Sequence, residues 1–587
     1  MSGPGQTMKR VLRERSPVLR AWSPHTPMTI QSREVLSRLK PAFVRTLGRE
    51  LDVRSLSGRM CPVMFEDGSA GVFTLAEYCH DDQTLAILDL LEAKGYRLNV
   101  TALFVLAPAL LLAIDRVGSG DVTGGVQRAS AQGGERSALD SAFNDLVAWG
   151  LTHGASDMHL NVDRAQPESA VRFTVAGRYV SPECYRNIPT ATMLDMLAVA
   201  WMDIQGGNGA VFDPSIEQQG RLTRFIRGKR VLLRWASLAT DAGPSVCMRL
   251  LVMDPCSLTP DLHALGYLPS QVEAFGRTRT TEGGAVVLAG VVGSGKSTTI
   301  ATLLRDIPAD RKVITLEDPA EYLIPNALQN TICRALDEQD EACFDTKLKT
   351  LKRSAMNDLL IGEIRDTTSG RAFMDLAGCG TNLYTTVHAG SALLICERLT
   401  SSFIGVARDF LATPGILNLL VFQSLVGRLC PECALSADQV FAAQGWHCVA
   451  GLGRNLPWFN AWLARIEELF GVPRGRLRFR SSQGCARCNT TGIPALRGTK
   501  GRTVVAEMIE PAREPGFLEG IKRNDVLGLH EWFHGRARTA LSDPCMDGKS
   551  AQHAAVYKMY CGQIDPREVE SRFGLFEQAF NKVTVRA

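Results

Sequence analysis

The clearest pattern along the chain is a series of short apolar runs, each followed directly by polar residues. Residues 285–289 (AVVLA) form the first run, and 312–316, 359–361 and 381–387 form three more. Runs of this length, bounded by turn residues, are typical of strands buried in a parallel sheet. Because ligands bind at the carboxyl ends of such strands, we expect the polar residues after the runs to converge on one site.

The residues after the first run form a phosphate-binding loop. Residues 290–297 have the sequence GVVGSGKS and connect the predicted strand to a helix predicted to begin near Lys296. The glycines allow backbone angles that turn successive N–H groups toward phosphate oxygens, and the helix N-terminus adds its positive end. In this pattern the lysine contacts the β- and γ-phosphates and the hydroxyl of Ser297 binds Mg²⁺. The predicted nucleotide-binding residues are Gly290, Gly293, Ser294, Gly295, Lys296, Ser297 and Thr298.

Carboxylates and a histidine follow the other three runs. Glu317 and Asp318 come after the second run, Glu363 after the third and His388 after the fourth. Carboxylates in such positions can hold Mg²⁺ or orient an attacking water, and His388 could contact the γ-phosphate. Helix caps and turns also use these residue types, so the residues alone leave a purely structural role open, above all for His388.

The ordered set of motifs resembles the secretion ATPases of type II secretion and type IV pilus assembly. The segments GVVGSGKST, ITLEDPAE, LLIGEIRD and TTVHA fall in the order of that family's Walker A, aspartate-box, Walker B and histidine-box motifs. The resemblance implies a hexameric cytoplasmic ring, recruited to the inner membrane, whose ATP hydrolysis drives the assembly of pilins or pseudopilins.

The resemblance also implies roles for single residues. Lys296 and Ser297 fall on the Walker lysine and hydroxyl, and Glu317 falls on the aspartate-box glutamate proposed to polarise the attacking water. Glu363 falls on the Walker B glutamate associated with Mg²⁺, and His388 falls on the histidine of its box. The sequence leaves open which glutamate is the base. Two valines stand at 291–292, where the family usually has Pro-Thr, and no group with an assigned role is lost.

Three arginines precede the phosphate-binding loop. Residues 221–234 predict a hairpin that turns near Gly228, and Arg221, Arg234 and Arg249 fall on family arginines that approach the nucleotide phosphates. A guanidinium stays charged and binds phosphate oxygens through two N–H groups, and an arginine on a mobile domain can couple closure to hydrolysis. From the residues alone, a solvated basic strand or a nucleic-acid patch with few aromatic residues are the alternatives.

Composition and charge narrow the class of protein. The chain has 587 residues, of which 45% are hydrophobic and 21% charged, and these values are typical of globular protein with several domains. A net charge of +4 does not favour a protein that coats nucleic acid. The apolar residues 103–114 are too few to span a bilayer and contain Pro108, and the Arg-rich N-terminus lacks the apolar core of a secretory signal.

Four of the sixteen cysteines have the spacing of metal ligands. Two CxxC pairs, Cys430 with Cys433 and Cys485 with Cys488, can present four thiolates to Zn²⁺ in a tetrahedron. Unrelated free thiols or a redox pair are the alternatives, although no thioredoxin-like context surrounds either pair. The resemblance favours zinc, because assembly and secretion ATPases often carry a tetracysteine insertion here. We interpret the other twelve cysteines as small buried apolar residues.

From these patterns and the resemblance we predict an α/β protein in which a RecA-like P-loop ATPase domain follows two smaller α+β N-terminal domains. The predicted parts are a flexible basic tail at 1–28, a first partner-binding domain at 29–117, a flexible linker at 118–137, a second, arginine-bearing domain at 138–253, a linker at 254–265, the ATPase domain at 266–515 with a zinc insertion at 430–488, and a helical C-terminal region at 516–587.

The predicted function is that of a Mg²⁺-dependent ATP hydrolase with a structural Zn²⁺. It would act as a homohexamer at the cytoplasmic face of the inner membrane, with a platform protein and accessory pilus or secretion proteins as partners, and without nucleic acid. The alternatives are a type IV secretion or conjugation traffic ATPase and a nucleic-acid translocase. The cysteine pairs and the two N-terminal domains argue against the first alternative, and the small net charge argues against the second.

Overall fold

The computed structural model describes most of the chain in segments. The described residues are 27–30, 33–48, 50–51, 59–106, 110–111, 114, 134–254, 260–279, 281–332, 340–444, 446–447, 453–490, 492–536 and 539–576. Nearly all of the predicted tail and most of the linker predicted at 118–137 lie outside these residues, as does part of the linker predicted at 254–265. The predicted domain boundaries therefore stay predictions.

The chain forms two compact units. The first consists of Met1–Leu146, Asn161–Val171 and Ser181–Ala200, and the second of Val147–Leu160, Arg172–Val180 and Trp201–Ala587. Among the described residues, no helix combines the length and the apolar character that a bilayer crossing requires.

The first unit contains a five-stranded sheet with the strand order β1-β5-β4-β3-β2. Its elements are β1 (Met28–Ile30), α2 (Arg33–Ser37), β2 (Phe43–Thr46), β3 (Met60–Phe65), β4 (Ala70–Thr74), α3 (Asp82–Ala93) and β5 (Leu98–Leu106). The helical spacing of apolar residues over 81–94 is confirmed by α3, whose first turn is capped when the Asp81 side chain accepts the N–H of Gln83. Phe65, Phe73 and Phe104 pack in the core of this sheet.

A seven-stranded sheet follows, with the order β10-β11-β12-β6-β7-β8 and β9 paired to β7. Its elements are α5 (Gly134–Thr152), β6 (Ala155–Asn161), β7 (Glu168–Val175), β8 (Arg178–Val180), β9 (Ile188–Pro189), α6 (Thr190–Trp201), β10 (Gln218–Ile226), β11 (Lys229–Thr240) and β12 (Gly243–Val252). The predicted hairpin is confirmed, because β10 and β11 are joined by Arg227 and Gly228. Both residues have positive φ, which matches the twist that a two-residue hairpin turn requires.

The largest sheet belongs to the second unit and has the order β15-β14-β16-β17-β13-β18-β21. Its strands are β13 (Gly284–Ala289), β14 (Val313–Glu317), β15 (Ala327–Thr331), β16 (Asp358–Ile361), β17 (Asn382–Val387), β18 (Leu417–Leu429) and β21 (Thr499–Ile509). The four apolar runs all form strands of this sheet. Every neighbouring pair is parallel except β18 with β21, which are antiparallel.

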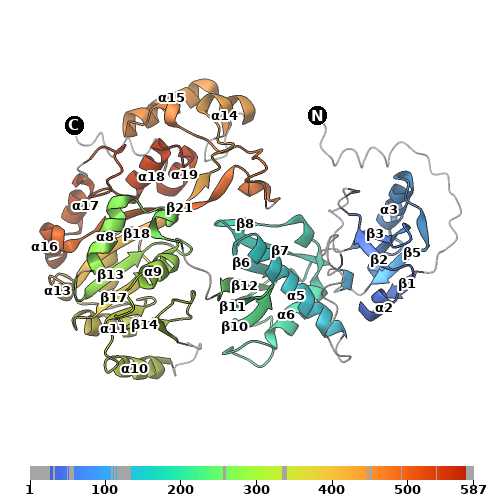
Figure 1. The fold of residues 1–587 in the computed structure, drawn as a ribbon, viewed down its shortest axis with the longest axis horizontal. Coiled ribbons are helices and arrows are strands. Elements are labelled where there is room, and N and C mark those ends of the chain that lie inside the picture. The colour runs from blue at the N-terminus through green and yellow to red at the C-terminus, as the bar shows by residue number, and fades with distance from the viewer. Residues whose placement is uncertain are drawn as a thin grey trace. The chain divides into compact units, whose positions relative to one another are not determined.

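Both faces of this sheet are covered, which is why its strands are apolar along their whole length. Ala285, Val287 and Ala289 face one core, where α11 (Thr367–Ala377) packs. Val286 and Leu288 face the other core, where α9 (Lys296–Arg305) and α8 (Pro269–Arg279) pack. A largely parallel sheet between two layers of helices confirms the predicted α/β class (Figure 1).

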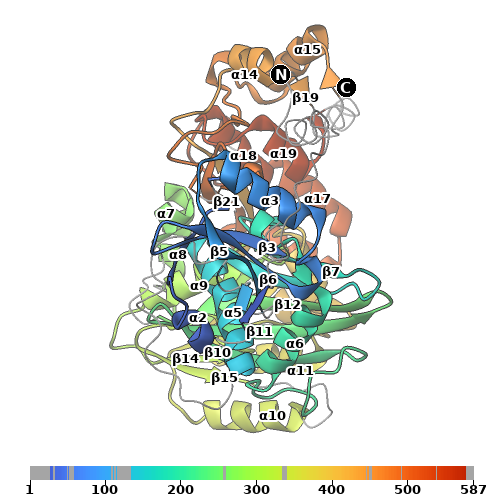
Figure 2. The same cartoon turned by 90° about the vertical axis from the view of Figure 1, so that its right-hand side faces the viewer.

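The remaining elements of the second unit are short helices and strands. They are α7 (Leu262–Leu265), α10 (Asp340–Leu351), α12 (Leu394–Thr400), α13 (Arg408–Leu411), α14 (Ala437–Gln444), β19 (Trp446–His447), β20 (Gly453–Arg454), α15 (Leu456–Phe470), α16 (Pro515–Arg523), α17 (Val526–Gly535), α18 (Ala551–Tyr560) and α19 (Pro566–Phe573). Helices α14 and α15 lie together at the opposite end of the unit from α10 in both views (Figures 1 and 2). The described part of the predicted C-terminal region is helical, as expected.

Candidate nucleotide-binding site

The phosphate-binding loop connects β13 to α9 at the carboxyl end of the central strand. Gly290, Gly293 and Gly295 have φ values of 153°, 75° and 86°, which side chains with a Cβ rarely adopt. A Cβ at Gly290 would lie 2.5 Å from both the Gln423 carbonyl oxygen and Ser294 Oγ. Glycine is therefore required here both by backbone angle and by space. The strand, loop and helix predicted from the sequence occur in that order.

The lysine of this loop is folded back into it. Lys296 is 9% exposed, and its Nζ donates to the carbonyl oxygens of Gly290 at 2.7 Å and Val291 at 3.2 Å. Burial lowers its pKa, whereas the nearby carboxylates of Glu363 and Glu321 act in the opposite direction. The ammonium thus lies inside the concave side of the loop, where a phosphate group would compete with the carbonyls for the same N–H groups.

Other side chains support the loop from the side opposite the cleft, and the motifs did not identify them. Gln423 lies within β18, donates its Nε2–H to the Ser294 carbonyl at 2.8 Å and accepts the Tyr267 hydroxyl at 2.5 Å. The Tyr267 hydroxyl also lies 3.2 Å from Thr299 Oγ1 on α9. At the front of α9, Thr298 Oγ1 lies 2.7 Å from the Tyr322 hydroxyl. The only available signal was a polar Gln423 inside an apolar strand, which implies a buried hydrogen-bond partner.

Glu317 is the last residue of β14 and lies beside the loop. Its Oε1 accepts the Thr315 hydroxyl at 2.7 Å and the Gln329 amide at 3.1 Å. Burial raises its pKa, and these two hydrogen bonds oppose that rise. The next residue, Asp318, pairs with Arg365 at 3.1 Å.

Glu363 and His388 meet at the ends of neighbouring strands. His388 Nε2 lies 3.1 Å from Glu363 Oε1, and His388 Nδ1 lies 3.2 Å from the Gly290 carbonyl oxygen. Both partners are acceptors, so a neutral ring donates its single N–H to one of them, and only a protonated ring donates to both. The structure therefore joins the third and fourth motifs directly to the phosphate-binding loop, as the strand endings predicted.

The three predicted arginines form one row across three strands. Arg221 on β10 is paired in register with Arg234 on β11, and Arg234 is paired with Arg249 on β12. Arg249 contacts Asp157 at 3.1 Å and Glu321 at 3.5 Å. The row places guanidinium groups at regular spacing, so that phosphate oxygens could meet more than one of them.

A cleft of about 1100 Å³ within the second unit brings most of the predicted residues together. Its described lining includes Gly293, Ser294, Gly295, Lys296, Ser297, Thr298, Glu317, Glu363, His388, Arg234 and Arg249. Arg221 is not among the described residues that line it, although it belongs to the arginine row. Arg502 of β21 also lines the cleft, with Nη1 3.5 Å from the Gly293 carbonyl, and the sequence reasoning did not single it out.

The four cysteines predicted to bind metal converge in space. Their Sγ atoms all lie within 4.8 Å of one another, with 3.7 Å between Cys430 and Cys485, 3.7 Å between Cys433 and Cys488, and 3.8 Å between Cys485 and Cys488. Zinc bonded tetrahedrally to four sulfurs at ~2.3 Å would hold them about 3.8 Å apart. The spacing and the donor set therefore fit Zn²⁺.

The cysteines differ in how readily they ionise, because burial raises the pKa of Cys430 and Cys433. Burial also acts to raise the pKa of Cys488, but the N–H groups of Cys485 and Gly498, each 3.2 Å from its Sγ, together with the side chains of Cys433 and Cys485, lower that pKa to about 7. Zinc binds the thiolate rather than the thiol, so donors aimed at sulfur assist binding.

A phosphate-binding loop at the carboxyl end of a parallel sheet covered by helices defines a P-loop nucleotide-binding protein. The chain belongs to the family of type II/IV secretion system proteins, because the model of that family matches residues 135–532, more than half of the chain. The family predicted from the ordered motifs is confirmed.

Similar proteins carry names from both branches of this family. The type II secretion system ATPase E of Vibrio cholerae is 28% identical over 295 residues, which are 50% of this chain and 54% of that protein. The type IV pilus assembly ATPase TfpB of Acinetobacter baylyi is 30% identical over 378 residues, 63% of this chain and 57% of that protein. Among solved structures, that of the Legionella pneumophila ATPase DotB is 17% identical with a TM-score of 0.46, and covers 74% of this chain and 95% of that one. The chain spans a little over half the length of these two curated relatives.

Proposed function

We propose that this protein hydrolyses ATP to power the assembly of a type IV pilus or a type II secretion pseudopilus. The observation that carries the proposal is the convergence of Lys296, Glu317, Glu363 and His388 on one loop at one edge of the sheet. The relatives named as secretion and pilus assembly ATPases support the same activity. We further propose a homohexamer at the cytoplasmic face of the inner membrane, with a platform protein and accessory proteins as partners.

Nucleotide binding would exchange one set of contacts for another. The backbone N–H groups of the loop and Lys296 Nζ would bind the phosphates, and Lys296 would leave the Gly290 and Val291 carbonyls that it now contacts. Ser297 and Glu363 are the side chains that would hold Mg²⁺, and the ion would offset negative charge on the phosphates. Gln423 would keep the loop in place during this exchange, because it holds the Ser294 carbonyl rather than the Lys296 ammonium.

Glu317 is the proposed residue that orients the attacking water. Thr315 and Gln329 both donate to Oε1, so their hydrogen bonds fix the orientation of the carboxylate, and Oε2 would accept from the attacking water. The raised pKa brings Glu317 closer to the pH at which it can take up a proton during the reaction. Glu363 is the other candidate base; we propose that it acts on the metal instead, and its contact with His388 supports a role in positioning the histidine.

The arginines would respond to phosphate charge. Arg249 now divides its hydrogen bonds between Asp157 and Glu321, and the contact to Glu321 is long at 3.5 Å. A phosphate oxygen offers a stronger charge-assisted partner, so nucleotide would draw Arg249 and Arg234 toward the site. Arg221 belongs to the same row, and we propose that it contacts the phosphates when the domains move. The predicted domain organisation and the zinc site at Cys430, Cys433, Cys485 and Cys488 form part of this proposal.

The test is the steady-state ATPase rate of the full chain beside Lys296→Ala, with and without single-stranded DNA. We expect Lys296→Ala to abolish turnover, and DNA to change neither rate. Lys312→Ala is the matched control, because Lys312 is exposed at the opposite end of the sheet, at the beginning of β14. Turnover that survives in Lys296→Ala would contradict the assignment of residues 290–297 as the nucleotide-binding loop. Strong stimulation by DNA would favour a translocase.

A further inference from the structure

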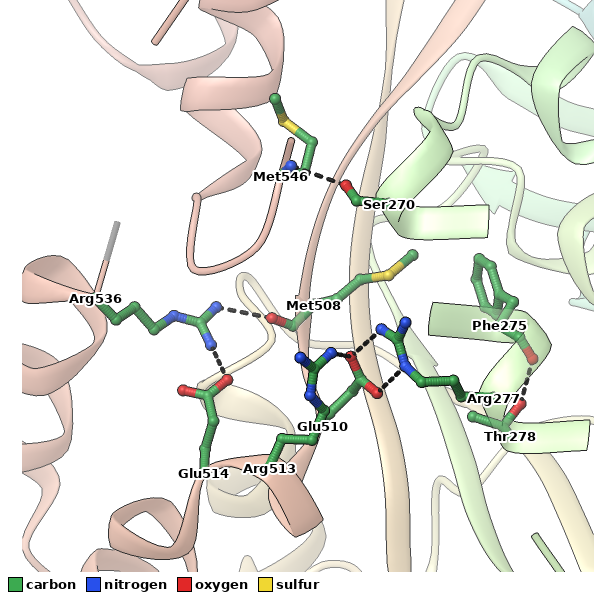
Figure 3. Close-up of polar contacts among 10 residues, drawn as sticks. All are labelled: Ser270, Phe275, Arg277, Thr278, Met508, Glu510, Arg513, Glu514, Arg536 and Met546. Carbon is green, nitrogen blue, oxygen red and sulfur yellow. Dashed lines mark hydrogen bonds and ion pairs between the residues drawn. The ribbon is translucent and has the colours of Figure 1, made fainter. Parts of the chain in front are cut away.

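Strand β21 is held in place by buried cations from several elements. Lys558 of α18 is 2% exposed, and its Nζ donates to Thr503 Oγ1 and the Val504 carbonyl, each at 2.6 Å, and to the Gly266 carbonyl at 2.5 Å. At the other end of the strand, Arg536 Nη2 donates to the Met508 carbonyl at 2.8 Å (Figure 3). These contacts are short and lie away from water, so they fix the strand firmly.

The end of β21 is fixed a second time by ion pairs. Glu510 accepts two hydrogen bonds from Arg277 of α8, at 2.8 and 2.5 Å, and Figure 3 shows its carboxylate between Arg277 and Arg513. Arg536 also contacts Glu514 at 2.9 Å. The strand is therefore a rigid support on which the side chains of its remaining residues have fixed positions.

Glu507 is the buried carboxylate of this support. It is 4% exposed, its Oε1 accepts the N–H of Ala392 at 2.8 Å, and its Oε2 accepts the N–H of Ala551 at 2.8 Å. Ala551 is the first residue of α18, where the positive end of the helix favours a carboxylate. Ala392 belongs to the loop of residues 388–393 that connects β17 to α12 and begins with His388.

We propose that Glu507 is a positioning residue that fixes the loop of residues 388–393 and thereby holds His388 beside Glu363 and Gly290. The inference rests on the proposed ATPase function. Val387 anchors the loop at its beginning as the last residue of β17, and Ala392, which is fully buried, anchors it near its end. His388 itself is exposed, and within the described part of the chain its side chain has two polar partners, at 3.1 and 3.2 Å. Its position therefore depends on the backbone of this loop.

The phosphate-binding loop has a different support. It is held by Gln423 and Tyr267, neither of which contacts the loop of residues 388–393 through a hydrogen bond shown by the described residues. Loss of Glu507 should therefore displace His388 and leave nucleotide binding in place. A glutamine at 507 has nearly the same shape but offers one oxygen, so one of the two N–H groups would face an NH₂ group without an acceptor.

The experiment measures kcat, KM, and the affinity for a fluorescent ATP analogue in the full chain and in Glu507→Gln. We expect kcat to fall about tenfold or more, because small displacements of catalytic groups have large effects on rate. The KM and the affinity for the analogue should stay within about twofold. Glu510→Gln is the matched control, because it removes a carboxylate from the same strand: we expect a lower melting temperature with kcat within about twofold. An unchanged kcat in folded Glu507→Gln overturns the proposal.

Amide hydrogen exchange supplies a second readout that needs no turnover. In Glu507→Gln we expect residues 388–394 to exchange at least about tenfold faster, with exchange at residues 290–298 unchanged. Faster exchange in both segments, or in neither, would show that Glu507 does not position this loop. Glu507→Asp keeps the charge but is one methylene shorter, and serves in the same assays if the glutamine variant fails to fold. Because exchange is measured without ATP, failure of the proposed function and failure of this inference are distinguishable.

Discussion

The nucleotide site and the layer of β21 and α18 differ in how their charged groups are paired. At the nucleotide site the ion pairs of Arg249 and His388 are partly exposed, with Arg249 3.5 Å from Glu321 and His388 3.1 Å from Glu363. In the layer of β21 and α18, Lys558 and Glu507 are buried and every contact measures between 2.5 and 2.8 Å.

The difference separates groups that change partners from groups that keep them. A buried polar group with all its hydrogen bonds made is costly to disturb, whereas a half-exposed pair exchanges partners at little cost. Substitutions in the nucleotide site should therefore reduce activity more than stability. Substitutions in the layer of β21 and α18 should mainly reduce stability, with Glu507 as the exception because it also holds the loop of His388.

The largest effect is expected for Glu317→Gln. Its amide oxygen can still accept from Thr315 and Gln329, so the fold keeps both hydrogen bonds while the proposed base is lost. We expect kcat to fall by about 100-fold or more, measured as steady-state ATP hydrolysis. The variant should also be more stable by about 1 kcal/mol at neutral pH, because an ionised carboxylate is no longer buried.

The pH dependence of that stability gain has a definite sign. Burial raises the pKa of Glu317 above its ordinary value of 4.5, so the native state holds its proton at pH values where the unfolded chain has released it. Stability of the parent protein is therefore lost as the pH rises above 4.5, and Glu317→Gln removes that loss. Denaturant unfolding at several pH values checks this. A gain that shrinks with rising pH would contradict it.

The second largest effect is expected for Lys558→Met on the buried side of the comparison. Three acceptors, the Gly266 and Val504 carbonyls and Thr503 Oγ1, would lose their donor. We expect the free energy of unfolding to fall by about 3 kcal/mol, while kcat of the folded protein changes less than about threefold. Lys522→Met is the control, since Lys522 is exposed on α16 and should cost little. A large loss of kcat without loss of stability would show that Lys558 serves activity rather than stability, against this expectation.

The smallest effect concerns His553, which caps α18 by accepting the N–H of Ser550 through Nδ1. Burial lowers its pKa from 6.5 to about 4, with Lys549 and His534 adding to the effect. The unfolded chain therefore binds more protons between pH 6.5 and 4, and stability is lost as the pH falls through this range.

Glutamine at 553 keeps a capping acceptor but does not titrate. In His553→Gln, the loss of unfolding free energy between pH 7 and pH 4 should therefore be smaller by on the order of 2 kcal/mol. Thermal melting at pH 7 and pH 4 measures the effect. His263→Gln, at an exposed position of α7, should behave like the parent protein. If both variants lose stability equally on acidification, His553 is not the titrating group.

The sequence predicted the parts of the site that follow from local pattern. Strand ends located Glu317, Glu363 and His388, and the glycine spacing located the loop of Lys296, because parallel strands bring their carboxyl ends to one edge. The CxxC spacing likewise located the four cysteines, since each pair lies within one turn. The arginines were predicted in part: the hairpin that carries Arg221 and Arg234 is as expected, their register with Arg249 was not predicted, and Arg221 is not among the described residues that line the cleft.

The supporting contacts could not be predicted in this way. Glu507 meets Ala392 and Ala551, and Lys558 meets Gly266, across separations along the chain that no local pattern encodes. Gln423 is a polar residue inside an apolar strand, and its partners Tyr267 and Ser294 lie far from it along the chain. Such contacts depend on which strands become neighbours, and the antiparallel pairing of β21 with β18 is visible only in the folded chain.

The cysteine cluster has a consequence for how the chain tolerates inserted sequence. Cys430 directly follows β18, and its N–H donates to the Gly498 carbonyl at 3.0 Å, immediately before β21 begins. The segment that carries α14 and α15 thus leaves and rejoins the sheet at adjacent points. A metal bound by the four cysteines would link the two ends of this segment. Exposed turns inside this segment, between β18 and β21, are suitable places to insert an epitope or a fluorescent reporter, because added length there would not strain the sheet.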